Sequence, residues 1–265
     1  MNKIGFIGCG NMAGAIIGGL VGNHLFPPEE IIGSDAITTV VENISMKYGI
    51  SIASNNTEVV ETCEVLVLSV KPQFYETVIT EIRDVVRPEQ IIITIAPGKT
   101  LQWLQDTFGR ECKIVRCMPN TPALVGEGIT GACASAQVTD EEAGYVKQIL
   151  SSFGKVEFVR EGLMDVVTAV SGSSPAYVFM FIEAMADAAV ADGMPRAQAY
   201  TFAAQAVLGS AKMVLETGTH PAELKDMVCS PGGTTIEAVS VLEKNGFRSA
   251  VIEGVRACTK KSKGI

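Results

Sequence analysis

A short run of glycine and hydroxyl residues near the end of the chain has the composition of an anion-binding loop. It reads Ser-Pro-Gly-Gly-Thr-Thr at residues 230–235 and leads into a helix-like run. The adjacent glycines, Gly232 and Gly233, allow backbone N–H groups to approach a ligand closely. Thr234 and Thr235 follow where a helix would begin, and there unpaired N–H donors and the positive end of the helix dipole favour a carboxylate or a phosphate. An ordinary Pro-Gly turn with a threonine N-cap explains the same residues equally well.

A second glycine-rich turn lies near the start of the chain. Residues 3–7 are expected to form a short buried strand, and Gly-Cys-Gly-Asn-Met-Ala at residues 8–13 leads from it into a helix. Strand, glycine turn and helix occur in this order in dinucleotide-binding βαβ units. Gly8 is expected to make the tight turn, and Gly10 to let the backbone approach a pyrophosphate. The other predicted cofactor contacts on this turn are Ile7, Cys9, Asn11 and Met12.

Strand-like and helix-like runs alternate up to about residue 160, which is typical of a doubly wound parallel sheet. Strands are expected at residues 30–33, 65–70, 91–96 and 114–118, and a helix at residues 38–48. Ligands bind open α/β sheets outside the carboxyl ends of the strands. The predicted contacts at those ends are Ser69, Val70, Lys71, Pro72, Ala96 and Pro97. Lys71 is equally compatible with a solvated loop, and Pro72 with the end of a strand.

Beyond about residue 160 the strand-like runs give way to helical runs rich in alanine and methionine, at residues 177–192, 196–216 and 247–260. Apolar residues cover nearly the whole circumference of the first helix. Because about 100 residues of such helices make a thin core, we expect a second subunit to complete it. The expected fold is therefore α/β: a Rossmann-type dinucleotide-binding domain at residues 1–160 and an all-helical dimerisation and substrate domain at residues 161–265.

Composition argues against several other classes of protein. The formal net charge of -8 disfavours a nucleic-acid or anionic-membrane partner. The seven cysteines are scattered, without a C-x-x-C pair, and only two histidines are present, so neither a disulfide framework nor a metal site is expected. No apolar run of membrane-spanning length is evident. We expect a cytoplasmic protein.

The chain resembles the pyrroline-5-carboxylate reductase family in five ordered motifs spread over its whole length. These are residues 7–13, 69–72, 116–122, 171–177 and 220–235. The resemblance implies hydride transfer from a reduced nicotinamide to a cyclic imine that carries a carboxylate, which gives proline in the last step of proline biosynthesis. It also implies NADP(H), and NAD(H) as well, as cofactor, a small-molecule substrate, and a homodimer or higher homo-oligomer.

This chemistry gives the loop at residues 230–235 a specific task. Gly232, Gly233 and Thr234 would hold the substrate carboxylate with backbone N–H groups. The imine nitrogen needs a proton or a hydrogen bond as hydride arrives, and Thr235 stands where the resemblance places the catalytic threonine. A hydroxyl is a weak acid, so Thr235 would polarise the nitrogen or relay a proton from water. The alternative role of Thr235 is that of a helix cap.

Three further positions follow from the resemblance. Glu161 matches an acidic residue near the substrate, although compensation of the dipole of a helix beginning there is an equally good explanation. Asn56 matches a cofactor contact, or alternatively caps a helix at residues 57–62. Ser174 replaces the glycine that often precedes the proline, and we expect its backbone to lie near the substrate.

Ser34 and Asp35, at the end of the second strand, bear on the choice of cofactor. A carboxylate there would bind the ribose hydroxyls of NADH and repel the extra phosphate of NADPH, and no arginine follows immediately. Local charge therefore favours NADH, whereas the resemblance favours NADPH.

Two other functions are compatible with parts of the sequence. A hydroxyacid or other imine reductase shares this architecture, but a hydroxyacid reductase normally needs a lysine or histidine acid that residues 230–235 lack. A non-catalytic dinucleotide-binding regulator would bind cofactor without turnover.

Overall fold

The computed structural model describes residues 4–264 and divides the chain into two compact units. The first unit comprises Met1–Ser173 together with Thr259–Ile265, and the second comprises Ser174–Cys258. The boundary expected after residue 160 thus lies within the first unit. Lys3, the start of the first predicted strand, lies outside the described residues.

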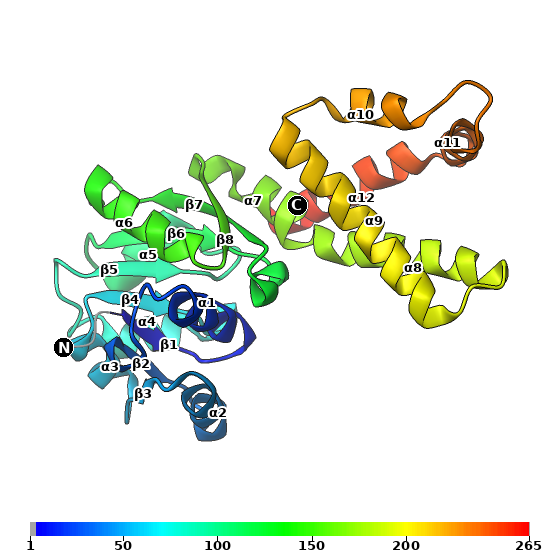
Figure 1. Cartoon of the computed structure of the whole chain (residues 1–265). Coiled ribbons are helices and arrows are strands. Elements are labelled where there is room, and N and C mark those ends of the chain that lie inside the picture. The colour runs from blue at the N-terminus through cyan, green and yellow to red at the C-terminus, as the bar shows by residue number, and fades with distance from the viewer. Residues whose placement is uncertain (1–3, 265) are drawn as a thin grey trace. The chain divides into compact units, whose positions relative to one another are not determined.

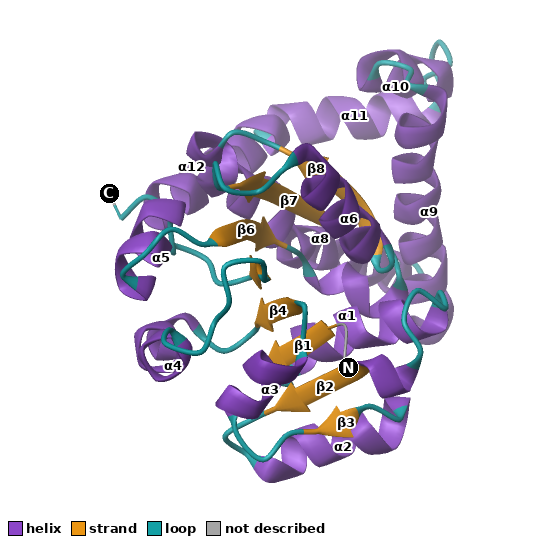
Figure 2. Cartoon of the chain, turned by 90° about the vertical axis from the view of Figure 1, so that its left-hand side faces the viewer, coloured by secondary structure: helices purple, strands orange, loops and turns teal. Residues whose placement is uncertain are grey.

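The described part of the first unit is built on an eight-stranded sheet (Figure 1). Its strands are β1 (Ile4–Ile7), β2 (Ile31–Ser34), β3 (Ser51–Ile52), β4 (Val65–Leu68), β5 (Ile91–Thr94), β6 (Lys113–Met118), β7 (Gly128–Ala134) and β8 (Gly154–Phe158). They are ordered β3-β2-β1-β4-β5-β6-β7-β8. The strands β1 to β6 are parallel, as the arrows of β1, β2 and β4 show in Figure 2, whereas β7 runs antiparallel to β6 and parallel to β8.

Helices cover both faces of this sheet. One apolar core joins it to α1 (Asn11–Gly22), α2 (Thr38–Tyr48) and α6 (Asp140–Ser151), and the other to α3 (Asn56–Thr62), α4 (Tyr75–Ile82) and α5 (Leu101–Phe108). Successive strand residues enter opposite cores: Val65 and Val67 belong to the first, Leu66 and Leu68 to the second. Burial of both faces explains why these strands are continuous apolar runs.

Short helical turns complete the first unit. They are the 3₁₀ turns η1 (Pro28–Glu30), η2 (Pro72–Phe74), η3 (Thr121–Val125) and η4 (Glu161–Leu163), the helix α7 (Met164–Val167) and the π-helical turn η5 (Thr168–Gly172). The prediction that Pro72 ends a strand is wrong, because β4 ends at Leu68 and Pro72 begins η2.

The second unit is helical, as predicted, and its packing contacts use small side chains. It contains α8 (Ser174–Ala191), α9 (Arg196–Thr217), α10 (Pro221–Val228), α11 (Thr234–Lys244) and most of α12 (Phe247–Ser262). The helices α8 and α9 lie side by side (Figure 1). Their buried side chains are the alanines Ala186, Ala199 and Ala203, whereas large apolar side chains such as Met180 and Phe202 are exposed. The core between these two helices therefore contains few large apolar side chains, as expected for a thin core.

One stretch of the described chain, Glu161–Ala191, meets a length and composition criterion for a membrane-spanning helix. This differs from the expectation that no such run exists. The stretch contains η4, α7, the π-helical turn and α8. Core helices of soluble proteins meet the same criterion, so the stretch is weak evidence for a membrane.

The N-terminus of α6 generates a stability prediction. Thr139 and Glu142 form a reciprocal capping box, and the Glu142 carboxylate also pairs with Lys113. Partial burial raises the pKa of Glu142, but hydrogen bonds from Lys113 and from the Thr139 N–H lower it more, so the pKa lies below its ordinary value.

Replacing Glu142 with Gln should lower the free energy of unfolding at pH 7 by up to about 1 kcal/mol. Because the folded pKa is depressed, the advantage of Glu142 is complete above the unfolded pKa of about 4.3 and is lost as pH falls through the folded value. Urea unfolding of both proteins between pH 7 and pH 3 measures this difference. A difference that does not depend on pH would contradict the ionic contribution.

Candidate functional site

The turn after β1 is fixed between two other strand ends. Gly8 has a φ of +92°, and a Cβ there would lie 2.8 Å from the Val70 nitrogen, so only glycine fits. The Gly8 N–H donates to the Ser34 carbonyl (2.8 Å), and the Ser69 hydroxyl donates to the Gly8 carbonyl (2.6 Å). The strand order reverses at β1, so this turn lies at the topological switch point, where such sheets bind dinucleotides.

The N-terminus of α1 presents backbone donors beside this turn. Its N-cap, Gly10, is exposed and makes no side-chain cap, and a Cβ added to Gly10 would meet nothing within 4 Å. The first turn, which begins with Asn11 and Met12, holds no acidic residue. The first N–H groups of a helix have no partner within it. This arrangement fits a pyrophosphate.

Cys9 is a packing residue of the turn. Its side chain is 1% exposed and belongs to the same core as Phe6. Burial, with a smaller contribution from the Asp35 carboxylate, raises the pKa of the Cys9 thiol to about 12. A buried thiol of this kind is a poor nucleophile.

The carboxylate of Asp35 holds the turn in place. One of its oxygens accepts a hydrogen bond from the Cys9 N–H (2.7 Å) and the other from the Ile37 N–H (2.9 Å). Asp35 therefore stabilises the turn independently of any contact with a ribose.

Asn56 lies beside Ser34, whose hydroxyl donates to the Asn56 carboxamide oxygen (2.7 Å). The Asn56 amide donates in turn to Glu81 (2.8 Å). The alternative that Asn56 caps α3 is wrong, because Asn55 is the N-cap and accepts from the Glu58 N–H (2.8 Å). The structure therefore brings two predicted cofactor residues together at the end of β2.

The ends of β4 and β5 carry the remaining predicted cofactor contacts. Lys71 is exposed and precedes η2, and Val70 is partly buried against the core. Ala96 is buried and Pro97 is exposed in the loop between β5 and α5.

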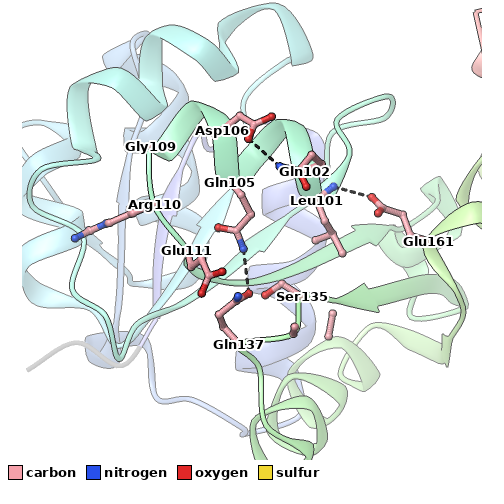
Figure 3. A pocket seen from close by; sticks show the side chains of 12 residues that line it. Leu101, Gln102, Gln105, Asp106, Gly109, Arg110, Glu111, Ser135, Gln137 and Glu161 are labelled. Atoms are coloured by element: carbon pink, nitrogen blue, oxygen red, sulfur yellow. Dashed lines mark hydrogen bonds between the residues drawn. The ribbon is translucent and has the colours of Figure 1, made fainter.

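Glu161 is bound to two groups of the first unit. Its Oε1 accepts hydrogen bonds from Arg116 (2.9 Å) and from the Leu101 N–H (2.6 Å). The second bond is drawn in Figure 3. Leu101 is the first residue of α5, so Glu161 stabilises the N-terminus of α5 and not only that of the turn it begins.

Sequence reasoning missed the separate role of Arg116, which it noted only as part of a motif. Arg116 is 5% exposed and lies on β6 opposite Cys133 of β7. Burial, then the Glu161 carboxylate, raises the pKa of the Cys133 thiol to about 11, and Arg116 lowers it. A charged residue within an apolar strand was the signal that could have identified it.

A cavity of about 670 Å³ opens beside Glu161 (Figure 3). Its lining includes Gln102 and Gln105 of α5 and Gln137 of the segment before α6. Among the described residues, Glu161 is the one predicted site residue that lines it. The glycine turn at residues 8–10 does not, so we do not place the cofactor in this cavity.

The loop before α11 in the second unit has the geometry of an anion-binding turn. Gly232 has a φ of +66°, and a Cβ added to Gly233 would lie 2.4 Å from the Ser230 hydroxyl oxygen. The helix begins at Thr234 with Gly233 as N-cap and no side-chain cap. The alternative that a threonine caps this helix is therefore wrong, and Thr235, which is half-buried, is free of that task.

Ser174 and His220 both lie at helix N-termini of the second unit. Ser174 is the first residue of α8 and is half-buried. His220 is the N-cap of α10, and its Nδ1 accepts from the Ala222 N–H (3.2 Å). Within residues 4–264, no group of three or more His, Cys, Asp or Glu side chains could hold a metal ion.

Comparisons with known proteins show which family the chain is similar to. Residues 161–265 match the family model described as pyrroline-5-carboxylate reductase dimerisation, and residues 3–98 match the model described as NADP oxidoreductase coenzyme F420-dependent. A pyrroline-5-carboxylate reductase of Escherichia coli is 52% identical over 99% of this chain and 98% of its own length.

Two solved structures are similar over their whole length. The pyrroline-5-carboxylate reductase of Coxiella burnetii has a TM-score of 0.92 at 33% identity and covers 99% of this chain and 98% of its own. The pyrroline carboxylate reductase of Plasmodium falciparum, solved with NADP bound, has a TM-score of 0.89 at 34% identity and covers 99% and 97%. The chain therefore belongs to the pyrroline-5-carboxylate reductase family.

Proposed function

We propose that this protein is an NAD(P)H-dependent oxidoreductase that reduces 1-pyrroline-5-carboxylate to L-proline. The observation that carries the proposal is the loop at residues 232–235, where two glycines lead into a helix N-terminus without a side-chain cap. The first N–H groups of this helix are donors for a carboxylate next to a half-buried hydroxyl. The identity of 52% with a pyrroline-5-carboxylate reductase over the full chain supports it.

The residues of the first unit fit a nicotinamide dinucleotide. Gly8 and Gly10, with the first turn of α1, would hold the pyrophosphate, and Ser34 and Asn56 would face the adenosine ribose. Ser69 to Pro72, Ala96 and Pro97 would line the rest of the cofactor. When bound, the reduced nicotinamide supplies the hydride. NADP(H) is the proposed cofactor, supported by the matched NADP oxidoreductase model and by the relative solved with NADP.

The residues of the second unit would act on the substrate. The Thr234 N–H would bind the carboxylate, with Gly232 giving the turn its left-handed conformation. The expectation that the Gly233 N–H is a free donor needs correction, because this group donates to the Ser230 carbonyl (3.1 Å) and closes the turn. The Thr235 hydroxyl would donate to the imine nitrogen, so that charge does not build up there during reduction. Ser174 would contribute its backbone. The resemblance also proposes Glu161 as a substrate contact.

We also propose a homodimer, or a higher homo-oligomer, formed through the helical half. Large apolar side chains are exposed on α8, α9, α11 and α12, and among them are Phe179, Met180, Phe202, Leu242 and Ile252. Monomeric proteins rarely leave such a surface in water. The match of residues 161–265 to a dimerisation model supports this assembly. Within residues 4–264, which include all seven cysteines, none is joined in a disulfide, and this fits the proposal of a cytoplasmic protein.

Replacing Thr235 with Ala should lower kcat about 100-fold, the loss typical of one transition-state hydrogen bond, while the dissociation constant for NADPH stays unchanged. Thr235→Ser should keep most of the activity. The control is Ser240→Ala, which removes another hydroxyl of α11 that donates to the Ile236 carbonyl. An unchanged kcat in Thr235→Ala would remove Thr235 from the mechanism.

Replacing Asp35 with Asn should raise the ratio of kcat/KM for NADPH to that for NADH severalfold, because about 1 kcal/mol of like-charge repulsion is removed. Both cofactors share the pyrophosphate, so damage to the glycine turn cancels in this ratio. Steady-state kinetics with each cofactor measure it. A strong NADPH preference of the unmodified enzyme, or an unchanged ratio in the variant, would contradict the reading of Asp35.

Replacing both Met180 and Phe202 with Glu should convert the oligomer to monomers, because charges on these exposed apolar faces oppose burial. Light scattering during gel filtration gives the mass, and circular dichroism tests whether the helices persist. Met46→Glu, an equally exposed methionine of the first unit, is the control. An unchanged mass of a folded double variant would exclude α8 and α9 from the interface.

A further inference from the structure

We propose that Glu161 and Arg116 form a positioning pair that fixes the loop between β5 and α5, residues 95–100, and so orders the surface that receives the cofactor. The inference rests on the proposed function, because Ala96 and Pro97 of this loop are proposed cofactor contacts. It gives Glu161 a role different from the substrate contact that the resemblance implies.

Hydrogen bonds hold the loop at both ends. At its start, the Ile95 N–H donates to the hydroxyl of Tyr75 (3.2 Å), and this fully buried tyrosine donates to the Leu68 carbonyl at the end of β4 (2.5 Å). At its end, the Leu101 N–H donates to Glu161 (2.6 Å). The first tie comes from an adjacent helix, whereas the second comes from a segment 60 residues further along the chain.

Arg116 determines where the Glu161 carboxylate lies. The Arg116 side chain is 6% exposed, and a buried guanidinium requires a nearby negative charge. The pair distance of 2.9 Å satisfies this requirement. The Glu161 side chain is 34% exposed, so the buried arginine is the more constrained of the two partners. Arg116 therefore holds the carboxylate against the N-terminus of α5.

The sheet register places this pair directly beside the loop. Arg116 is the neighbour of Thr94, the last residue of β5, in the β5–β6 ladder. The Thr94 hydroxyl is fully buried and has no hydrogen-bond partner among the described residues. The ion pair therefore lies beside the start of the loop, where the Thr94 side chain makes no hydrogen bond, and it holds the far end of the loop at Leu101.

The test is Glu161→Gln, compared with Glu142→Gln as the matched control. Glu142 also pairs with a cation of β6, Lys113, but it lies at the N-terminus of α6. Two readouts need no turnover: the dissociation constant for NADPH, measured by fluorescence, and hydrogen exchange of the amides of residues 95–101 in the protein without cofactor. A third is the KM for pyrroline-5-carboxylate.

We expect Glu161→Gln to speed exchange at Leu101 and to raise the dissociation constant for NADPH about fivefold, as when one charge-assisted hydrogen bond weakens. The KM for the imine should stay unchanged, and Glu142→Gln should change none of the three. A raised KM for the imine with an unchanged dissociation constant would overturn the proposal in favour of a substrate contact. Unchanged exchange and cofactor binding would overturn it as well.

A double variant, Arg116→Met with Glu161→Leu, separates positioning from folding. It removes both charges together, so no unpaired charge stays buried. We expect it to fold and still bind NADPH weakly, because Leu101 has lost its acceptor. Normal NADPH binding by this variant would overturn the proposal. If the unmodified protein did not reduce the imine, the proposed function would be wrong. Hydrogen exchange would still test whether Glu161 holds the Leu101 N–H.

Discussion

The close contact between the turn after β1 and the end of β4 is the constraint on which the first unit depends. Gly8 can approach the backbone of Val70 only because it has no side chain. This approach lets β1 lie between β2 and β4, where the strand order reverses. Ser34, Ser69 and Asp35 then converge on one turn through hydrogen bonds to its backbone. The proposed cofactor surface follows from that convergence.

The two proposed anion sites share a way of starting a helix. Gly10 precedes α1 and Gly233 precedes α11, and neither makes a side-chain cap. By contrast, α3, α5, α6 and α10 begin with capping side chains from Asn55, Thr100, Thr139 and His220. A cap consumes the N–H donors that an anion would need. Glycine leaves these donors available, although some other helices here, α2 among them, also begin without a cap.

Much of the fold was predictable because its signals are local. The glycine turn, the helix at residues 38–48 and the loss of strands after residue 160 follow from composition and periodicity. The strands β7 and β8 were not predicted, because neither is the continuous apolar run that marks a strand buried on both faces. The strand β7 consists mostly of small residues, and in β8 only Val156 is buried. The capping box of Thr139 and Glu142, which marks the start of α6, was not predicted either.

The candidate site was predictable in its residues but less so in their roles. Asn55, not Asn56, caps α3, because the helix begins at Asn56, one residue earlier than predicted. The Asn55 side chain is therefore the one that accepts from the Glu58 N–H. The tie between Glu161 and Arg116 joins positions 45 residues apart, and no local pattern reveals such a pair. Long-range polar contacts of this kind depend on strand register, which the sequence does not state.

The alanine contacts between α8 and α9 have a consequence for how the chain acquires its structure. Burying alanine removes little apolar surface from water, so the second unit gains little free energy by folding alone. In the proposed assembly, folding of this half and association of subunits become one bimolecular process. The midpoint of its thermal unfolding then rises with protein concentration, and dilution alone weakens the native state.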